Sequence, residues 1–200
     1  MKIAILNLKA YARRARVAQL INAAREAHVP GWKIYIAVPS AFIGLFAGAD
    51  ILAQHADAVE LGAHTGAVLP AHLKDLGIAG SLLNHVEKPH PAVTKAVDML
   101  HEEGLIAVVC TEGEIIEKAD MIAYERRGFI GGEKSIASAA EDLRALRRRA
   151  KGTLLAGGGI KTHSDVETLL KLGYDGILIG SAFAKATDPQ AFLEDLLGSK

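Results

Sequence analysis

Short apolar runs alternate with longer amphipathic stretches from one end of this sequence to the other, and this alternation constrains the fold more than any other feature. Most of the apolar runs are nearly continuous. This is typical of parallel strands buried on both faces, whereas a half-solvated strand alternates apolar and polar residues. We expect eight strands, at Lys2–Asn7, Lys33–Val38, Asp50–Gln54, Ile78–Leu83, Leu105–Cys110, Met121–Glu125, Thr153–Ala156 and Gly176–Ile179.

The stretches between the strands show helical periodicity. Clear helices are expected at Arg13–His28, Pro91–Glu103, Lys134–Arg149, Ser164–Leu172 and Pro189–Leu197, and shorter, weaker ones at Ser40–Phe46, Pro70–Leu76 and Gly113–Lys118. Several are flanked by residues that prefer helix ends. The prolines suited to a first turn are Pro70, Pro91 and Pro189, the expected N-caps are Ser164 and Asp188, and the glycines suited to helix ends are Gly77, Gly104 and Gly173.

Two architectures accept eight strands and eight helices in strict order, a closed (β/α)8 barrel and an open doubly wound sheet. An open sheet that binds nucleotides carries a glycine-rich turn after its first strand. Residues 7–11, which follow the first strand here, contain no glycine. The sequence therefore predicts an α/β protein with a compact (β/α)8 TIM-type barrel, in a single domain over residues 1–200, near the lower size limit of that fold.

Composition argues against several classes of protein. The 23 Lys and Arg residues balance 23 Asp and Glu residues, so no net charge attracts nucleic acid or a membrane surface. The single cysteine, Cys110, excludes an intramolecular disulfide framework. The apolar start at residues 3–6 is too short for a signal peptide, and the weakly polar run at residues 38–49 is too short to cross a membrane. We expect a cytoplasmic protein without nucleic-acid or membrane partners.

Histidines are numerous, but their spacing does not indicate a metal site. Five of the eight histidines fall on expected helices or loops without the spacing of metal ligands. The segment His85-Val86-Glu87 fits half of a zinc deaminase signature, but a chain with one cysteine lacks the second half. We expect neither a metal nor another cofactor.

Glycine-rich loops follow the last two predicted strands, where barrels of this type usually hold phosphate. Glycine lets backbone N–H groups approach an anion closely. Gly157-Gly158-Gly159 follows the seventh strand, and Gly180-Ser181 follows the eighth. A lone run of three glycines is more often a tight turn, but two such loops adjacent in a closed barrel favour a phosphate monoester ligand.

Three ionisable residues end predicted strands at the same end of the barrel: Lys9, His85 and Glu125. Each alone would more often be a surface residue in an ion pair. Together, facing a phosphate pocket, they form a set for proton transfer. The carboxylate can take a proton from a carbon next to a carbonyl, and the imidazole and ammonium can stabilise the resulting oxyanion.

These residues stand in segments that resemble the triosephosphate isomerase family, and its short archaeal branch most closely. The catalytic segments that carry the resemblance are Asn7-Leu8-Lys9, Leu82–Glu87, Ala123-Tyr124-Glu125 and Gly128–Gly132. The segments similar to the archaeal branch are Ala53-Gln54-His55, Gly62–Pro70 and Ala184–Pro189. The similarity runs in the same order from Ile3 to about Leu197, and this ordered set is far more specific than any one motif.

The resemblance implies a cofactor-free isomerase of glycolysis and gluconeogenesis that interconverts dihydroxyacetone phosphate and D-glyceraldehyde 3-phosphate. It implies that Lys9 binds the substrate and supports charge on an enediolate. A neutral His85 would move protons between the two oxygens, and Glu125 would move a proton between the two carbons, a division of roles known for this family. Asn7 would lie in the substrate site, and Glu87 would pair with the ammonium of Lys9.

The resemblance also implies a lid after Glu125, with Gly131 and Gly132 gripping the phosphate. Arg126-Arg127 stands where a proline usually follows the glutamate, and Ile130-Gly131-Gly132 is one residue shorter than the usual lid tip. Lid closure protects a reactive intermediate. We therefore expect a looser lid that loses part of the intermediate as methylglyoxal and phosphate.

Two apolar loops indicate self-association. The segments Val38–Phe46 and Ala63–Leu69 are too apolar for loops that face only water, and contiguous apolar surface usually marks an interface. The family resemblance implies the same, so we expect a homodimer or homotetramer joined through these loops.

Two other functions stay open. A phosphate-binding barrel lyase or aldolase would need a Schiff-base lysine inside a strand, whereas Lys9 lies just past the first strand. A non-catalytic or weakly active sugar-phosphate-binding barrel is the second alternative, and the lid changes favour it.

Overall fold

The strands form one closed parallel barrel. The structure, a computed structural model, describes residues 1–132 and 134–198. Within them each strand pairs with the next along the chain, and the last pairs with the first, so the sheet has no edge. The strands are β1 (Lys2–Asn7), β2 (Trp32–Val38), β3 (Ile51–Ala53), β4 (Gly80–Leu83), β5 (Ile106–Thr111), β6 (Met121–Glu125), β7 (Thr153–Gly157) and β8 (Gly176–Ile179). The predicted (β/α)8 barrel is confirmed.

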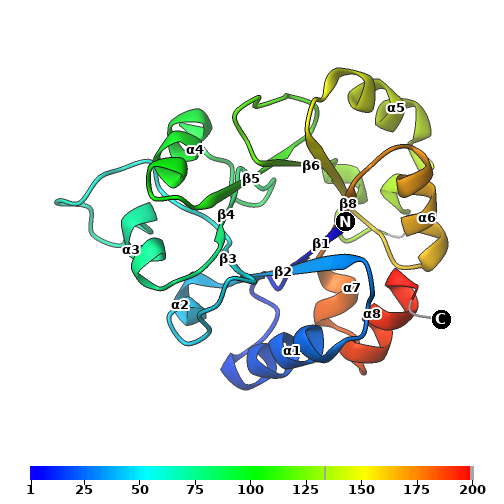
Figure 1. Ribbon diagram of the computed structural model, residues 1–200, viewed down its shortest axis with the longest axis horizontal. Helices are drawn as coiled ribbons and strands as arrows, with labels where there is room; N and C mark the ends of the chain where they lie inside the picture. The colour runs from blue at the N-terminus through cyan, green and yellow to red at the C-terminus, as the bar shows by residue number, and fades with distance from the viewer. Residues whose placement is uncertain (133, 199–200) are drawn as a thin grey trace.

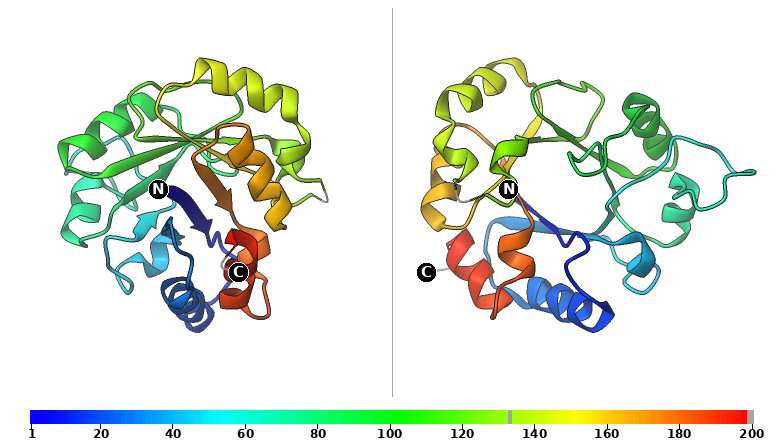
Figure 2. Two further views of the ribbon diagram at one scale, coloured as in Figure 1. Left: turned by 45° about the vertical axis from the view of Figure 1, so that its right-hand side comes forward. Right: turned by 180° about the vertical axis from the view of Figure 1, so that it is seen from behind.

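The helices lie outside the ring of strands (Figure 1). They are α1 (Arg14–Glu26), α2 (Ser40–Ile43), α3 (Pro70–Asp75), α4 (Val93–Glu102), α5 (Ala140–Arg149), α6 (His163–Lys171), α7 (Ser181–Ala184) and α8 (Pro189–Leu197), with 3-10 turns η1 (Arg127–Phe129) and η2 (Ile136–Ser138). The segment between β3 and α3 projects away from the barrel in Figure 1 and in the right-hand view of Figure 2. No helix among the described residues is long and apolar enough to cross a membrane.

Two of the expected helices differ from the structure. Residues 112–120, all of them described, form a loop, so the helix predicted at Gly113–Lys118 is wrong. Gly113 has a φ of 143°, outside the helical range, and donates its N–H to the Thr111 hydroxyl. A six-residue segment also has little helical stability to offset this local turn. The helix predicted at Lys134–Arg149 is divided into η2 and α5.

The helix ends were predicted with mixed success. Asp188 caps α8, and Gly77, Gly104 and Gly173 all have the positive φ of a left-handed helix end. Ser164 is not an N-cap, because Thr162 and Asp165 form a reciprocal capping box that begins α6 earlier. Pro91 precedes α4 by two residues and does not begin it.

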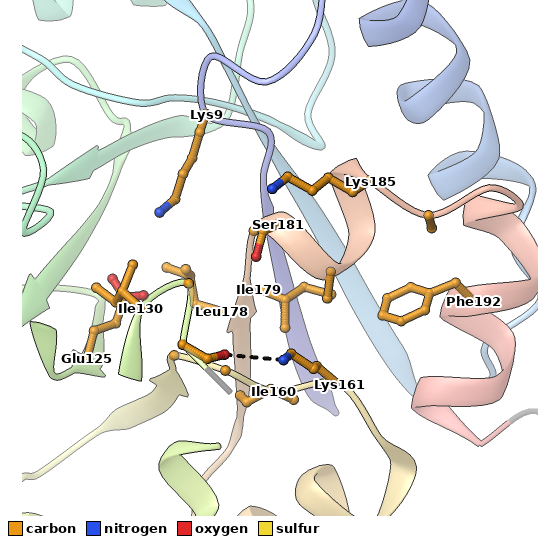
Figure 3. A pocket seen from close by; sticks show the side chains of 17 residues that line it. Lys9, Glu125, Ile130, Ile160, Lys161, Leu178, Ile179, Ser181, Lys185 and Phe192 are labelled. Atoms are coloured by element: carbon orange, nitrogen blue, oxygen red, sulfur yellow. Dashed lines mark hydrogen bonds between the residues drawn. The ribbon is translucent and has the colours of Figure 1, made fainter. Parts of the chain in front are cut away.

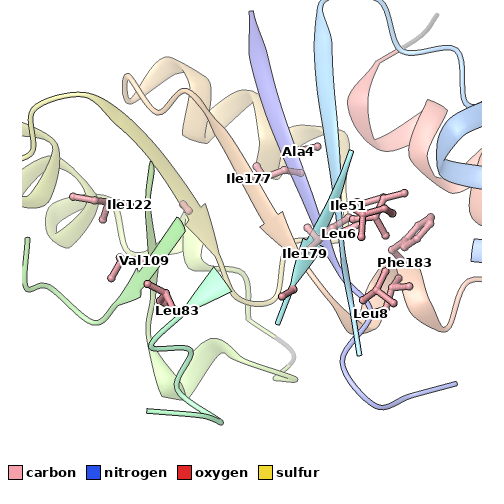
Figure 4. Packing of buried hydrophobic residues seen from close by; sticks show 14 of the residues in the cluster. Ala4, Leu6, Leu8, Ile51, Leu83, Val109, Ile122, Ile177, Ile179 and Phe183 are labelled. Atoms are coloured by element: carbon pink, nitrogen blue, oxygen red, sulfur yellow. The ribbon is translucent and has the colours of Figure 1, made fainter. Parts of the chain in front are cut away.

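Apolar residues fill two layers, which explains why the strands read as continuous apolar runs. Alternate strand residues point into the barrel and pack there, among them Ile5, Tyr35, Leu52, Leu82, Val108, Leu155 and Leu178. The intervening residues, among them Ala4, Leu6, Val109 and Ile177, point outward and pack with helix residues such as Phe183 of α7 (Figure 4). With both faces of the strands buried, the polar residues concentrate at the strand ends, where the barrel opens.

Candidate active site

The chain turns sharply after β1 and directs Lys9 over the end of the barrel. Lys9 has a φ of 46°, which is uncommon for a residue other than glycine, and its N–H donates to Asn7 Oδ1 at 3.1 Å. Its Nζ lies 2.7 Å from Glu87 Oε1, so the predicted ion pair between Lys9 and Glu87 is present. A β-carbon at Gly180 would lie 3.2 Å from Lys9 Cε. Asn7 and Glu87 thus hold the two ends of this residue, and Gly180 leaves room for its stem.

His85 follows β4 in a tight turn that holds its ring in one orientation. Asn84, directly before it, has a φ of 57°. The Asn84 side chain donates to the Cys110 carbonyl of β5 and accepts from the N–H of His90 in the loop after β4. The N–H of Glu87 donates to His85 Nδ1 at 3.1 Å, so the proton of the neutral ring lies on Nε2. Burial, and after it the positive charge of Lys9, lowers the pKa of His85 to about 4. At neutral pH the ring is therefore an uncharged Nε2–H donor.

Glu125 ends β6 as a buried carboxyl group, 5% exposed. Burial raises the pKa of Glu125 to about 7, although the ammonium of Lys9 and a hydrogen bond from the Cys110 thiol both favour the ionised form. A β-carbon at Gly157, its partner on β7, would lie 2.8 Å from Glu125 Oε1. Glycine at position 157 is thus what makes room for this side chain. A carboxyl group whose pKa lies near neutral pH is suited to take up and release a proton.

The facing atoms of His85 and Glu125 have no hydrogen-bond partner. His85 Nε2 and Glu125 Oε2 lie 3.3 Å apart, and both are buried. Among the described residues only one other buried side-chain polar atom, His55 Nδ1, lacks a partner. Buried polar groups are nearly always hydrogen-bonded in native proteins, so an unpaired donor and an unpaired acceptor at one point indicate a ligand position.

A cavity of about 400 Å³ extends from Glu125 toward α7 and α8 (Figure 3). Most of the predicted substrate-binding residues line it: Lys9, Glu125, Gly131, Gly132, Gly158, Gly159, Gly180 and Ser181. Lys9 and Glu125 therefore stand at one end of this cavity, and the loops after β7 and β8 form the other end.

The remaining predicted residues lie beside this cavity. Asn7, His85 and Glu87 line an adjacent cavity of about 270 Å³, into which Lys9 also reaches. Gly157 lines neither of the two, because it lies within β7 beneath the Glu125 side chain. In the structure Gly157 leaves room for the Glu125 side chain, whereas the sequence analysis placed it among the phosphate-binding residues.

The first hinge of the predicted lid is held by two carboxylates. Arg126 forms an ion pair with Asp142 of α5, and the N–H of Arg127 donates to Glu112 Oε1 at 2.9 Å. Arg126 has a φ of −116°, well outside the range that proline allows. Ion pairing and hydrogen bonding therefore restrain this hinge in the absence of a proline ring.

Sequence comparison identifies the family of this protein. The sequence model of the triosephosphate isomerase family matches residues 2–125 and 114–196, which together span nearly the whole chain. The chain belongs to the triosephosphate isomerase family. Its predicted membership, based on the ordered motifs, is confirmed.

Relatives within the triosephosphate isomerase family include several archaeal proteins. The triosephosphate isomerase of Cenarchaeum symbiosum is 34% identical over 97% of this chain and 96% of its own length. That of Sulfurisphaera tokodaii is 36% identical over 84% of this chain and 80% of its own. A crystal structure of triosephosphate isomerase from Bartonella henselae covers 100% of this chain and 99% of its own, with a TM-score of 0.76 at 22% identity, which shows the shared fold.

Two lysines of the cavity were missed by the sequence analysis. Lys161 Nζ donates to the carbonyl of Gly132 at 3.2 Å, which joins the lid to the loop after β7. Lys185 lines the cavity from the end of α7. Both lie a few residues beyond the glycine loops, so a search for cations beyond the strand ends would have found them. Asn84 was also missed as the residue that sets the turn of His85, and its positive φ has no sequence signal apart from the tolerance of asparagine for that conformation.

The histidines do not assemble a metal site. Among residues 1–132 and 134–198, no three His, Cys, Asp or Glu side chains are grouped so that they could hold a metal ion. Cys110 is buried, and burial raises the pKa of its thiol well above the ordinary value. This cysteine is therefore a thiol that contacts Glu125 rather than a thiolate nucleophile.

Proposed function

We propose that this protein interconverts dihydroxyacetone phosphate and D-glyceraldehyde 3-phosphate, with Glu125, His85 and Lys9 as its catalytic residues. The observation that carries this proposal is the pair of unpartnered buried atoms, His85 Nε2 and Glu125 Oε2, 3.3 Å apart beside a cavity with glycine loops at its far end. One atom is a neutral donor and the other is the oxygen of a carboxyl group with a pKa near 7. Family membership supports the same activity.

The reaction is a proton transfer between adjacent carbons. The Glu125 carboxylate takes a proton from C1 of dihydroxyacetone phosphate, and the electron pair of that C–H bond forms an enediolate with its negative charge on O2. The Nε2–H of His85 and the ammonium of Lys9 stabilise this charge. His85 delivers a proton to O2 and recovers one from O1, and Glu125 returns its proton to C2, which yields D-glyceraldehyde 3-phosphate. No cofactor enters this balance.

The phosphate group would occupy the glycine end of the cavity. Gly131 and Gly132 of the lid, Gly158 and Gly159 after β7, and Gly180-Ser181 after β8 all line this region. Backbone N–H groups in such loops bind anions without side chains that would block a close approach. Asn7 and Glu87 would act through Lys9, which both of them contact.

A coupled isomerase assay on the purified protein tests this proposal. We expect turnover of both triose phosphates without added metal or cofactor, and loss of turnover in Glu125→Gln. Binding of triose phosphate without turnover would support a non-catalytic sugar-phosphate-binding barrel instead. Trapping of a covalent adduct on Lys9 by borohydride would support a lyase or aldolase.

We further propose a homodimer or homotetramer. The projecting segment between β3 and α3 places Leu61 in solvent, 71% exposed, and Leu45 after α2 is 53% exposed. Leu45 lies within the first predicted interface loop, Val38–Phe46, and Leu61 lies two residues before the second, Ala63–Leu69. Light scattering tests this assignment, and a monomer at micromolar concentration would overturn it. The remaining parts of the proposal are a single domain over the chain, a cytoplasmic location and a place in glycolysis and gluconeogenesis.

A further inference from the structure

Lys185 directs an ammonium group into the candidate active site from the end of α7, the short helix that follows β8. It follows the short helix α7 and lines the same cavity as Lys9, Ser181 and Gly159. In Figure 3 the side chains of Lys9 and Lys185 extend into this cavity from two directions, and Ser181 lies just below the ammonium of Lys185. The position of Lys185 is thus at the glycine end of the cavity, away from His85.

Tyr11 and the backbone of α7 hold Lys185 in this position. The Nζ of Lys185 lies 4.9 Å from the centre of the Tyr11 ring, within the range of a cation–π interaction. The N–H of Lys185 donates to the Ser181 carbonyl at 3.0 Å. Tyr11 lies two residues beyond Lys9 in the turn after β1, so the loops after β1 and β8 meet at this contact.

The charge of a phosphate ligand favours a cation at this end of the cavity. A phosphate monoester carries a charge of about −1.5 to −2 at neutral pH, and the backbone N–H groups of the glycine loops are neutral. Lys9 is already paired with Glu87. Lys161 has no carboxylate partner among the described residues, but its ammonium already donates to the Gly132 carbonyl of the lid. Among the described residues no carboxylate lies within ion-pairing distance of Lys185, which leaves its charge available to a ligand.

We propose that Lys185 binds the phosphate group of the substrate, and that Tyr11 is the positioning residue that aims it. This inference rests on the proposed isomerase function and adds a side-chain cation to the phosphate site. Hydrogen bonds to charged partners are stronger and shorter than neutral ones. Lys185 therefore discriminates phosphorylated from phosphate-free substrates.

The test compares Lys185→Met with the wild-type protein on three ligands. We expect KM for triose phosphate and the inhibition constant of inorganic phosphate to rise by roughly tenfold to a hundredfold, the range for a lost hydrogen bond to a charged group. Turnover of D-glyceraldehyde, which has the same reacting carbons and no phosphate, should change by less than about twofold. Lys185→Arg should restore most of the phosphate affinity.

The matched control is Lys33→Met. Lys33 also places its Nζ over an aromatic ring, that of Tyr35 at 4.8 Å, but it lies near the start of β2 at the opposite end of the barrel. Its loss removes one charge and one cation–π contact without affecting the site, so the phosphate constants should stay within about twofold. For Tyr11, Tyr11→Phe should keep the phosphate affinity because its ring still holds the ammonium, whereas Tyr11→Leu should weaken it.

Each outcome decides the proposal. Unchanged phosphate constants in Lys185→Met, or an equal loss with D-glyceraldehyde, would overturn it, because the residue would then be either idle or merely structural. If the wild-type protein shows no turnover at all, the isomerase function fails, and calorimetric binding of inorganic phosphate to the two proteins still decides the role of Lys185. Phosphate affinity that is equal in both proteins, or absent from the wild-type protein, would then refute it.

Discussion

The substitution Glu125→Gln should stabilise the folded protein while it removes the proposed catalytic base. Burial raises the pKa of Glu125 from 4.5 to about 7, so ionisation of this group opposes folding. At about 1.4 kcal/mol for each pH unit, the ionised form costs the folded state about 3 kcal/mol. Glutamine keeps the shape and carries no charge. Above about pH 8 the variant should therefore be more stable by up to about 3 kcal/mol, or roughly 6 to 12 °C in melting temperature for a chain of this size.

The size of this gain should depend on pH. Below pH 4.5 Glu125 is protonated in both the folded and the unfolded protein, and its cost disappears. Between about pH 4.5 and 7 the unfolded chain loses the proton while the folded protein keeps it, so the wild-type free energy of unfolding falls as the pH rises. The advantage of the variant should grow through this window and level off above it.

His85 acts in the opposite direction over nearly the same window. Its pKa falls from 6.5 to about 4 on folding. As the pH falls, the unfolded chain therefore protonates His85 before the folded protein does, and the free energy of unfolding decreases from pH 6.5 toward pH 4. The two effects partly cancel in the wild-type protein. They separate in the difference between wild type and Glu125→Gln, because the lowered pKa of His85 comes from burial and Lys9, which both proteins share.

Urea unfolding of the two proteins from pH 4.5 to 8.5 measures this difference. Glu60→Gln, a change at an exposed carboxylate, is the control and should alter stability by less than about 0.5 kcal/mol. Turnover by Glu125→Gln should fall by about 10² to 10⁴ with phosphate affinity retained. A wild-type protein as stable as the variant at pH 8, or a difference that does not vary with pH, would refute the reasoning.

Three further predictions test other parts of the site. Lys9→Ala should weaken both substrate binding and turnover, because it removes the ammonium beside the reacting oxygens, and an unchanged kcat/KM would demote Lys9 to a surface residue. The wild-type kcat/KM should rise with pH and level off above about pH 7, since Glu125 must be ionised to accept a proton; a flat profile from pH 5.5 to 8.5 would contradict this. Glu112→Ala and Asp142→Ala should each raise the release of phosphate and methylglyoxal during turnover, because they remove the acceptors that hold the hinge at residues 126–127, and release no greater than in the wild-type protein would argue against this role.

The barrel could be predicted from sequence because its strands are buried on both faces. Each strand therefore appears as an apolar run whose boundaries are clear, as at Lys2–Asn7 and Met121–Glu125, where prediction and structure coincide. The failures lie in short segments. Residues 113–118 contain too few positions to show a helical period, and Gly113 adopts a φ that only glycine tolerates well. At α6 the decisive signal was the spacing of Thr162 and Asp165, which fits a capping box better than Ser164 does.

The candidate site could be predicted in part because a charged group at the end of a buried apolar strand is costly unless it is paired or binds a ligand. Glu125 ends an apolar strand, and Lys9 and His85 each lie two residues beyond one, so sequence position alone marked them. The properties that suit them to proton transfer come from the fold. Glu125 is buried by neighbours that are distant in sequence. The N–H of Glu87 reaches His85 Nδ1 through a turn that has no recognisable sequence pattern, and this contact leaves the proton of the neutral ring on Nε2. Lys185 was missed because it lies beyond its loop, at the end of α7.

The glycines of the two predicted phosphate loops do more than admit an anion. A β-carbon at Gly157 would lie 2.8 Å from both Glu125 Oε1 and the Leu178 carbonyl oxygen, and one at Gly180 would lie 3.2 Å from Lys9 Cε. Neither glycine has a positive φ, so the left-handed conformation is not what requires glycine at these positions. The space is needed by the side chains of Glu125, the proposed catalytic base, and Lys9, the proposed substrate-binding lysine. Gly157 in β7 and Gly180 after the neighbouring strand β8 therefore leave the space in which Glu125 and Lys9 stand beside the candidate phosphate site.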